Sequence, residues 1–192
     1  MTPRTSKALL LQKLYEPYKK CSACPLGLKV QHNFVCGNGN PHTKLILIGE
    51  APGQHEDEQG LPFVGKSGML LTKTLECLGI DRKDIFITNI VKCRPPNNRK
   101  PTSEESKKYK HLFLLKEIEI IKPKVICTLG ATALEGLLEN PVKMGEMHGK
   151  QVLFDKNIIL IPTYHPAYIL RDPRKFNEWF ADLQKAWNLS QE

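Results

Sequence analysis

The chain has 192 residues and a formal net charge of +8, with 41% hydrophobic and 25% charged residues. This balance excludes a disordered or fibrous protein, and the length suits one well-packed domain over residues 1–192. No apolar run approaches the roughly 20 residues that span a bilayer, and the N-terminal stretch is typical of an amphipathic helix rather than a signal peptide. We therefore expect a cytoplasmic protein, and the excess positive charge suits a polyanion such as nucleic acid.

Apolar segments of strand length alternate with helical patterns along the chain. The strand-like segments are residues 44–49, 84–91, 124–130 and 157–166, and the longer helical patterns are residues 67–78, 104–121 and 173–189. Alternation of this kind, with strands that are apolar throughout, is typical of a parallel sheet covered on both faces. The sequence therefore predicts an α/β fold with three α/β/α layers and a central, mainly parallel four-stranded sheet.

Polar and conformationally special residues gather in the loops that follow these strands. The four loops begin at Glu50, Asn89, Gly130 and Tyr164. Because ligands of such sheets bind outside the carboxyl ends of the strands, we expect the four loops to form one crevice.

One stretch, "GLPFVGKS", matches the phosphate-binding pattern G-x-x-x-x-G-K-[ST]. A phosphate-binding loop leaves a strand directly and wraps phosphates with backbone N–H groups. Here the preceding residues, "QHEDEQ", cannot form a buried strand, Pro62 has no N–H, and Phe63 crowds the loop. We therefore interpret the match as accidental and expect no nucleotide cofactor.

Three longer motifs account for this region better: residues 49–68, "GEAPGQHEDEQGLPFVGKSG", residues 88–102, "TNIVKCRPPNNRKPT", and residues 165–171, "HPAYILR". In this order they closely resemble the family 4 uracil-DNA glycosylases, iron–sulfur enzymes of bacteria and archaea. The resemblance extends from about Cys21 to the last helical pattern. It implies a monofunctional DNA glycosylase for base excision repair, which flips uracil out of DNA, hydrolyses its N-glycosidic bond and leaves an abasic site.

The resemblance also assigns residues to the uracil pocket. It implies that the Asn89 amide pairs with uracil O4 and N3–H, and that His165 donates a hydrogen bond to uracil O2, where charge builds as the base departs. Phe63 is expected to stack on the flipped base, and Glu50 to crowd the 5-position and so exclude thymine.

The placement of the attacking water is a separate expectation. Better-known uracil glycosylases carry an Asp directly after the residue equivalent to Glu50, and this chain has Ala51 there. Glu56 is our candidate for positioning the water, with Asp57 next, and the backbone at Ala51 is expected to share the task.

Other residues are candidates for DNA contacts. Ile169 or Leu170 is expected to fill the hole left by the flipped base, with Arg171 on the phosphates. Further candidate phosphate contacts are Lys66, Lys92, Arg94, Arg99 and Lys100. The substrate is uracil-containing DNA, single- or double-stranded, and we expect a monomer with no membrane partner; a sliding-clamp partner is left open.

The metal site departs from the family pattern. Members hold a [4Fe–4S] cluster with four cysteines, and Cys21, Cys24 and Cys93 fill three of these places, but Tyr109 stands at the fourth. His111 or Cys36 is the nearest substitute ligand. Alternatively, the cluster is incomplete, or Tyr109 packs in its place and the cysteines are relics or bind zinc. The pattern favours a cluster of some kind.

Two further interpretations concern function and packing. A chain of this fold could bind DNA without turnover, or excise deaminated bases with a shifted preference. The remaining cysteines, Cys77 and Cys127, lie in apolar periodic segments, and we expect both to be small core residues.

Overall fold

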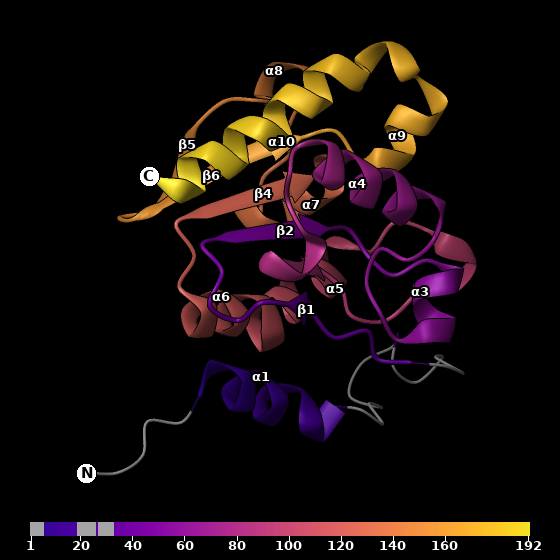
Figure 1. The fold of residues 1–192 in the computed structure, drawn as a ribbon. Helices are drawn as coiled ribbons and strands as arrows, with labels where there is room; N and C mark the ends of the chain where they lie inside the picture. The colour runs from indigo at the N-terminus through magenta and orange to yellow at the C-terminus, as the bar shows by residue number, and fades with distance from the viewer. Residues whose placement is uncertain (1–5, 19–25, 27–32) are drawn as a thin grey trace.

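The computed structural model describes residues 6–18, 26 and 33–192 (Figure 1). The strands are β1 (Asn38–Gly39), β2 (Leu45–Gly49), β3 (Phe86–Asn89), β4 (Val125–Leu129), β5 (Val152–Asp155) and β6 (Ile158–Thr163). The helices are α1 (Lys7–Tyr15), α3 (Gln54–Gln59), α4 (Lys66–Cys77), α5 (Ser103–Tyr109), α6 (Leu115–Ile121), α7 (Ala131–Leu138), α8 (Met144–Met147), α9 (Pro166–Arg171) and α10 (Phe176–Gln191).

These strands form one six-stranded sheet in the order β1-β3-β2-β4-β6-β5. The inner strands β3, β2, β4 and β6 run parallel, which confirms the four predicted strands. The edge strands β1 and β5 pair antiparallel and were not predicted. Two residues are too few for β1 to show a periodic pattern, and β5 alternates between half-buried and exposed positions instead of being apolar throughout.

Alternate residues of the inner strands feed two separate cores, one on each face of the sheet. Leu45 and Leu47 pack with residues of α4 and α10, whereas Ile46 and Ile48 pack with residues of α1, α6 and α7. Figure 1 shows α10 across one face of the sheet, with α1 and α6 on the other side. The predicted three layers are therefore confirmed.

The predicted helix over residues 104–121 is one continuous rod with an irregular middle. Its first part, α5, begins at the N-cap Thr102, whose hydroxyl accepts from Glu105 N, and a π-helical turn over Lys110–Leu114 joins α5 to α6. Lys122, in the left-handed region at φ 53°, ends the rod. A π-turn carries an extra residue, so it changes which side chains of α6 face the sheet.

The two cysteines expected in the core have different environments. Cys127 on β4 is fully buried, as predicted, whereas Cys77 at the end of α4 is exposed, so the second prediction was wrong. Cys77 occupies the last position of α4, two residues after the buried Leu75, and so points to the opposite side of the helix. In the described part of the chain, no helix is long and apolar enough to cross a membrane.

Candidate functional site

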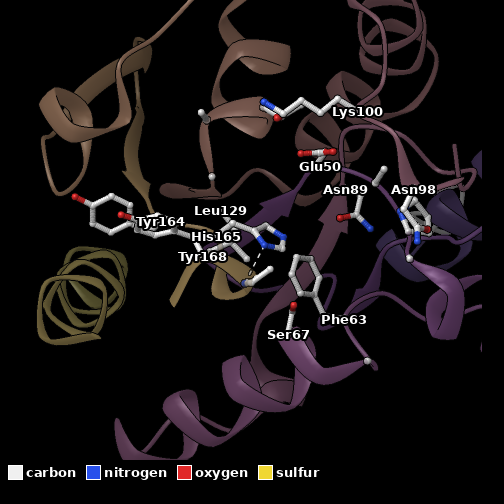
Figure 2. A pocket seen from close by; sticks show the side chains of 18 of the residues that line it. Glu50, Phe63, Ser67, Asn89, Asn98, Lys100, Leu129, Tyr164, His165 and Tyr168 are labelled. Atoms are coloured by element: carbon white, nitrogen blue, oxygen red, sulfur yellow. Dashed lines mark hydrogen bonds between the residues drawn. The ribbon is translucent and has the colours of Figure 1, made fainter. Parts of the chain in front are cut away.

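A cavity of about 1080 Å³ opens at the carboxyl ends of the parallel strands (Figure 2). Residues of all four predicted loops line it, among them Glu50, Asn89, Gly130 and His165. The topology explains this, because β2, β3, β4 and β6 end at the same edge of the sheet. The predicted crevice is confirmed.

Asn89, the last residue of β3, points its amide into the cavity (Figure 2). Parallel pairing continues past the strand, because Ile90 N donates to Gly49 O at 2.9 Å, and this places Asn89 beside Gly49. A Cβ atom on Gly49 would overlap both Asn89 Oδ1 and the Phe63 ring, so glycine is required there. Asn89 is 2% exposed, and its Oδ1 has no hydrogen-bond partner among the described residues. An unpaired buried acceptor costs about 1–3 kcal/mol, so this atom favours a ligand that brings a donor.

Phe63 forms an aromatic wall beside Asn89. Its φ of 54° is unusual for a bulky residue and is held by Arg82, which donates from Nη1 to Phe63 O at 2.7 Å and also bonds Pro62 O. Gly68 completes the fit, because a Cβ atom there would overlap the Phe63 carbonyl. Sequence reasoning missed both roles, because Arg82 lies outside the quoted motifs and Gly68, the last residue of the 49–68 motif, carries no side chain that would mark it as part of a site.

His165 faces Phe63, with their ring centroids 5.9 Å apart. It is the N-cap of α9, and its Nδ1 accepts from Ala167 N at 3.1 Å. The neutral ring must then carry its proton on Nε2, which is left to donate into the cavity. Burial, and secondly the positive charge of Arg171, lowers the pKa of His165 from 6.5 to about 4, so the ring is a neutral donor near pH 7.

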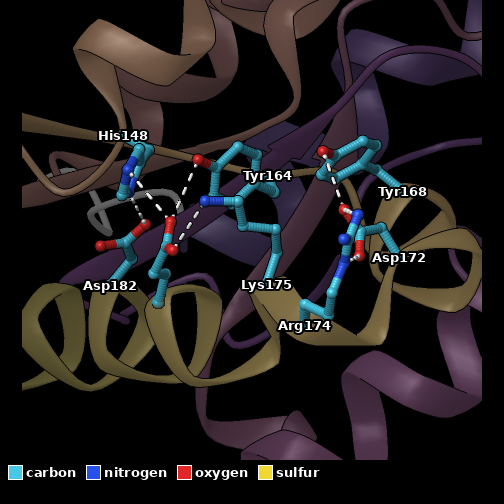
Figure 3. A network of polar contacts seen from close by, with 8 residues as sticks. His148, Tyr164, Tyr168, Asp172, Arg174, Lys175 and Asp182 are labelled. Carbon is cyan, nitrogen blue, oxygen red and sulfur yellow. Dashed lines mark hydrogen bonds and ion pairs between the residues drawn. The ribbon is translucent and has the colours of Figure 1, made fainter.

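The chain before His165 is tied to α10 by a polar network (Figure 3). Thr163 Oγ1 donates to Asp182 Oδ2 at 2.7 Å, and the His148 ring lies 3.2 Å from the same carboxylate. Tyr164 donates its hydroxyl to Glu178 at 3.2 Å. Since Thr163 ends β6, these contacts fix the strand end that carries His165.

Glu56 has a structural role that its sequence position did not reveal. Its carboxylate accepts from Gly53 N at 3.1 Å, from Val64 N at 2.9 Å and from Gly65 N at 2.8 Å. One side chain therefore holds the start of α3 and the start of α4 together. Glu50 and Ala51 belong to the loop between β2 and α3, and both line the cavity as predicted. Glu56 lines the cavity as well.

The candidate DNA-contacting residues separate into two groups by exposure. Lys66, Arg171, Arg99 and Lys100 are exposed and line the cavity. Arg94 is held by Asn98, with its Nε donating to Oδ1 at 2.8 Å, and does not line the cavity.

Two of these predictions are corrected by burial. Lys92 is fully buried and its Nζ lies 2.7 Å from Glu117, so it cannot contact phosphates. The segment that follows β3 is itself buried from Ile90 to Cys93, and Lys92 belongs to it. Of the two candidate wedge residues, Ile169 is buried at 3% exposure in the core, whereas Leu170 is 48% exposed. Leu170 alone is available to enter a DNA duplex.

The candidate cluster ligands are only partly visible. Cys21 and Cys24 lie outside the described residues. Cys93 and Tyr109 are buried in the same core cluster, and the half-buried Cys36 packs against it. His111 is instead exposed, with its Nε2 3.5 Å from Glu139 at the surface. Within residues 6–18, 26 and 33–192, no three His, Cys, Asp or Glu side chains gather as a metal site, although the Cys93 and Cys36 thiols are donors that suit iron–sulfur or zinc chemistry.

Comparison with known proteins adds the family. Residues 36–189 match the family model described as the uracil DNA glycosylase superfamily. A type-4 uracil-DNA glycosylase of Thermotoga maritima is 48% identical over 85% of this chain and 84% of its own length. The type-4 enzymes of Pyrobaculum aerophilum and Archaeoglobus fulgidus are 44% and 37% identical, over 90% and 93% of this chain and 91% and 92% of their own lengths.

Proposed function

The chain belongs to the uracil-DNA glycosylase superfamily, and from this premise we propose that it excises uracil from DNA, a hydrolytic step of base excision repair. The observation that carries the proposal is the buried Asn89 Oδ1, which has no hydrogen-bond partner among the described residues and lies beside the Phe63 ring, with that ring facing the His165 donor. A non-catalytic DNA-binding protein has no need of this arrangement.

Base selection follows from hydrogen-bond chemistry at Asn89. Uracil presents an N3–H donor and an O4 acceptor, which match the Oδ1 and the amide NH₂ of Asn89. Cytosine presents an acceptor at N3 and a donor at position 4, so the same amide, held in one orientation, meets it with like groups. Phe63 stacks on the base, and Glu50 stands at the cavity wall as the proposed barrier to a 5-methyl group.

Bond cleavage follows from the His165 donor. As the C1′–N1 bond breaks, the electron pair leaves with uracil and negative charge builds on O2, while the sugar becomes oxocarbenium-like. The neutral Nε2–H of His165 donates to O2 and stabilises this charge without needing a proton from solvent. Water then adds to C1′ and gives up a proton to solvent, and the departing uracil anion takes up one proton, so that neutral uracil and an abasic sugar result. We propose that the water is held by the Ala51 loop, with the Glu56 carboxylate supplying fixed negative charge nearby.

DNA is proposed to be held by the exposed cations at the rim. Lys66 and Arg171, which are exposed and line the cavity, are proposed to contact phosphates near the flipped nucleotide, and Leu170 is proposed to fill the vacated stack.

The experiment that tests this function is uracil release from labelled oligonucleotides. The substrates carry uracil opposite guanine, uracil opposite adenine, or uracil in a single strand, with thymine and hypoxanthine as controls. We expect alkali-labile abasic sites from the uracil substrates. DNA binding without release would instead support the non-catalytic alternative, and preferential release of hypoxanthine would support a shifted base preference.

We also propose that Cys21, Cys24 and Cys93 hold a [4Fe–4S] cluster whose role is structural, since Cys thiolates are the usual ligands of such clusters. Iron and sulfide analysis with the visible absorption spectrum tests this. We expect Cys93→Ala to lose iron, whereas bound zinc in the purified protein would contradict an iron–sulfur cluster. The iron content of Cys36→Ala and of His111→Ala then identifies the fourth ligand. The variant that loses iron is the one that lacks this ligand.

The lowered pKa of His165 predicts a specific pH dependence. In the unfolded chain this ring takes up a proton as pH falls through 6.5, whereas in the folded chain it stays neutral down to about 4. The unfolded chain therefore binds more protons in this interval, and the contribution of His165 to stability falls as pH drops from 6.5 toward 4. We expect the Tm of the wild type to decrease as pH falls over this range, and the Tm of His165→Asn to decrease less. We also expect the uracil-release rate of the wild type to show no inflection near pH 6.5. An inflection there that vanishes in His165→Asn would contradict a neutral donor.

A further inference from the structure

An ion pair is buried directly behind the base-recognition residue Asn89. The side chains of Lys92 and Glu117 are both fully buried, and Lys92 Nζ lies 2.7 Å and 2.9 Å from the two carboxylate oxygens. Removing two charges from water is costly, and well-packed apolar residues are often as stable as a buried pair or more so. Stability of the core alone therefore does not account for this pair.

The further contacts of Lys92 lead to the site. Its Nζ donates to the Asn89 carbonyl oxygen at 2.8 Å and also to Thr88 Oγ1. Thr88 and Asn89 are the last two residues of β3, where the sheet ladder ends. The ammonium thus holds the peptide that follows Asn89, while on the cavity side the Asn89 Oδ1 has no partner in the described part of the chain.

Glu117 extends the same network to two other elements. It accepts from Tyr15 OH at 2.6 Å and from Thr88 Oγ1 at 3.1 Å. Tyr15 ends α1, and Glu117 belongs to α6, just after the π-helical turn. The carboxylate is therefore fixed from three sides, and it fixes Lys92 in turn.

We propose that Lys92 and Glu117 are positioning residues for uracil recognition, acting through the Asn89 main chain. They hold the end of β3 so that the Asn89 amide meets uracil in one orientation and at one depth. This inference rests on the proposed function and adds to it two residues that never touch DNA.

The test separates positioning from stability. In Lys92→Met alone, the Glu117 carboxylate is buried without its cation, so both Tm and uracil release should fall. In the triple variant Tyr15→Phe/Lys92→Met/Glu117→Met, no buried charge of this network is left unpaired, and of its side chains the neutral Thr88 hydroxyl alone loses its partners. Tm should therefore return most of the way to the wild-type value. Uracil release should stay at least tenfold slower than in the wild type, because the bond to Asn89 O is still missing. Recovery of release together with Tm would overturn the proposal.

A mutant cycle with Asn89→Ala shows whether the effect passes through that residue. Once the Asn89 amide is gone, its placement no longer matters. Adding the three substitutions to Asn89→Ala should therefore slow uracil release by less than a further twofold. Fully additive losses would overturn the proposal. Glu117→Gln, which keeps the side-chain shape, gives a second cycle if the triple variant does not fold, with the same sub-additive result expected.

Matched controls distinguish this proposal from the proposed function. Ile118→Ala, next to Glu117 on α6 and in the core cluster that contains Tyr15, should lower Tm but leave release within twofold at temperatures where the protein is folded. A wild-type protein that releases no uracil would refute the function itself. Wild-type release with additive losses in the cycle would refute only the positioning role.

Discussion

Replacing His165 with alanine is expected to slow uracil release by about 10²–10³-fold, the usual cost of removing one donor to a developing negative charge. The structure gives the reason: Nδ1 is occupied by Ala167 N, so the single ring proton is presented to the cavity. Single-turnover release from a uracil oligonucleotide measures the effect, because it is free of product dissociation.

The same experiment on Asn89→Ala should give at least a tenfold loss, through base recognition instead of charge stabilisation. Affinity for uracil-free DNA and Tm are the controls, and both should be nearly unchanged in the two variants. If both variants instead lose their folded structure to the same extent as their activity, neither residue can be assigned to catalysis.

Gly68→Ala is expected to be the most damaging substitution outside the residues that contact uracil. In an ordinary helix interior, Gly→Ala stabilises by roughly 1 kcal/mol. On α4 the new Cβ would overlap the Phe63 carbonyl, so the segment bearing Phe63 must shift. A displacement of about 1 Å at a positioned group costs on the order of 10²-fold in rate, and we expect a loss of that size in uracil release.

Gly145→Ala on α8 is the matched control for this prediction. Gly145 also lines the cavity, but a Cβ there would meet nothing within 4 Å. Its Tm should not fall, and its release rate should stay within a few fold of the wild type. Unimpaired release by Gly68→Ala would show that the Phe63 segment yields without consequence and that its placement is not critical.

The inner part of the sheet was predictable because its strands carry a strong hydrophobic signal. Strands buried on both faces are apolar throughout, and this made the four inner strands visible. Edge strands have no such signal: β5 has one face in solvent, and β1 is too short. The short helix α3 was also missed, because "QHEDEQ" contains no apolar stripe and is held by Glu56 rather than by core packing.

The sequence predicted which loops line the cavity, because the carboxyl ends of parallel strands lie at one edge of the sheet. It did not predict the direction in which individual side chains point. Lys92 and Arg94 are close in sequence, yet one is fully buried and the other reaches the surface, and the deciding partner of Lys92, Glu117, is distant in sequence. The same holds for Ile169 and Leu170, where the rotation of a single short helix decides which of two neighbouring apolar residues remains exposed.

The stretch that imitates a phosphate-binding loop has a chemical explanation after all. The backbone N–H groups at the start of α4, Val64 N and Gly65 N, do bind an anion, but the anion is the chain's own Glu56 carboxylate. A helix start that is opened by a glycine in this way can hold a foreign phosphate, and it can equally hold a neighbouring helix of the same chain. A sequence pattern for nucleotide binding detects the residues that donate the N–H groups but not the group that accepts from them. In this chain the acceptor is a carboxylate of the protein itself, so such a carboxylate should be looked for before a nucleotide cofactor is assigned.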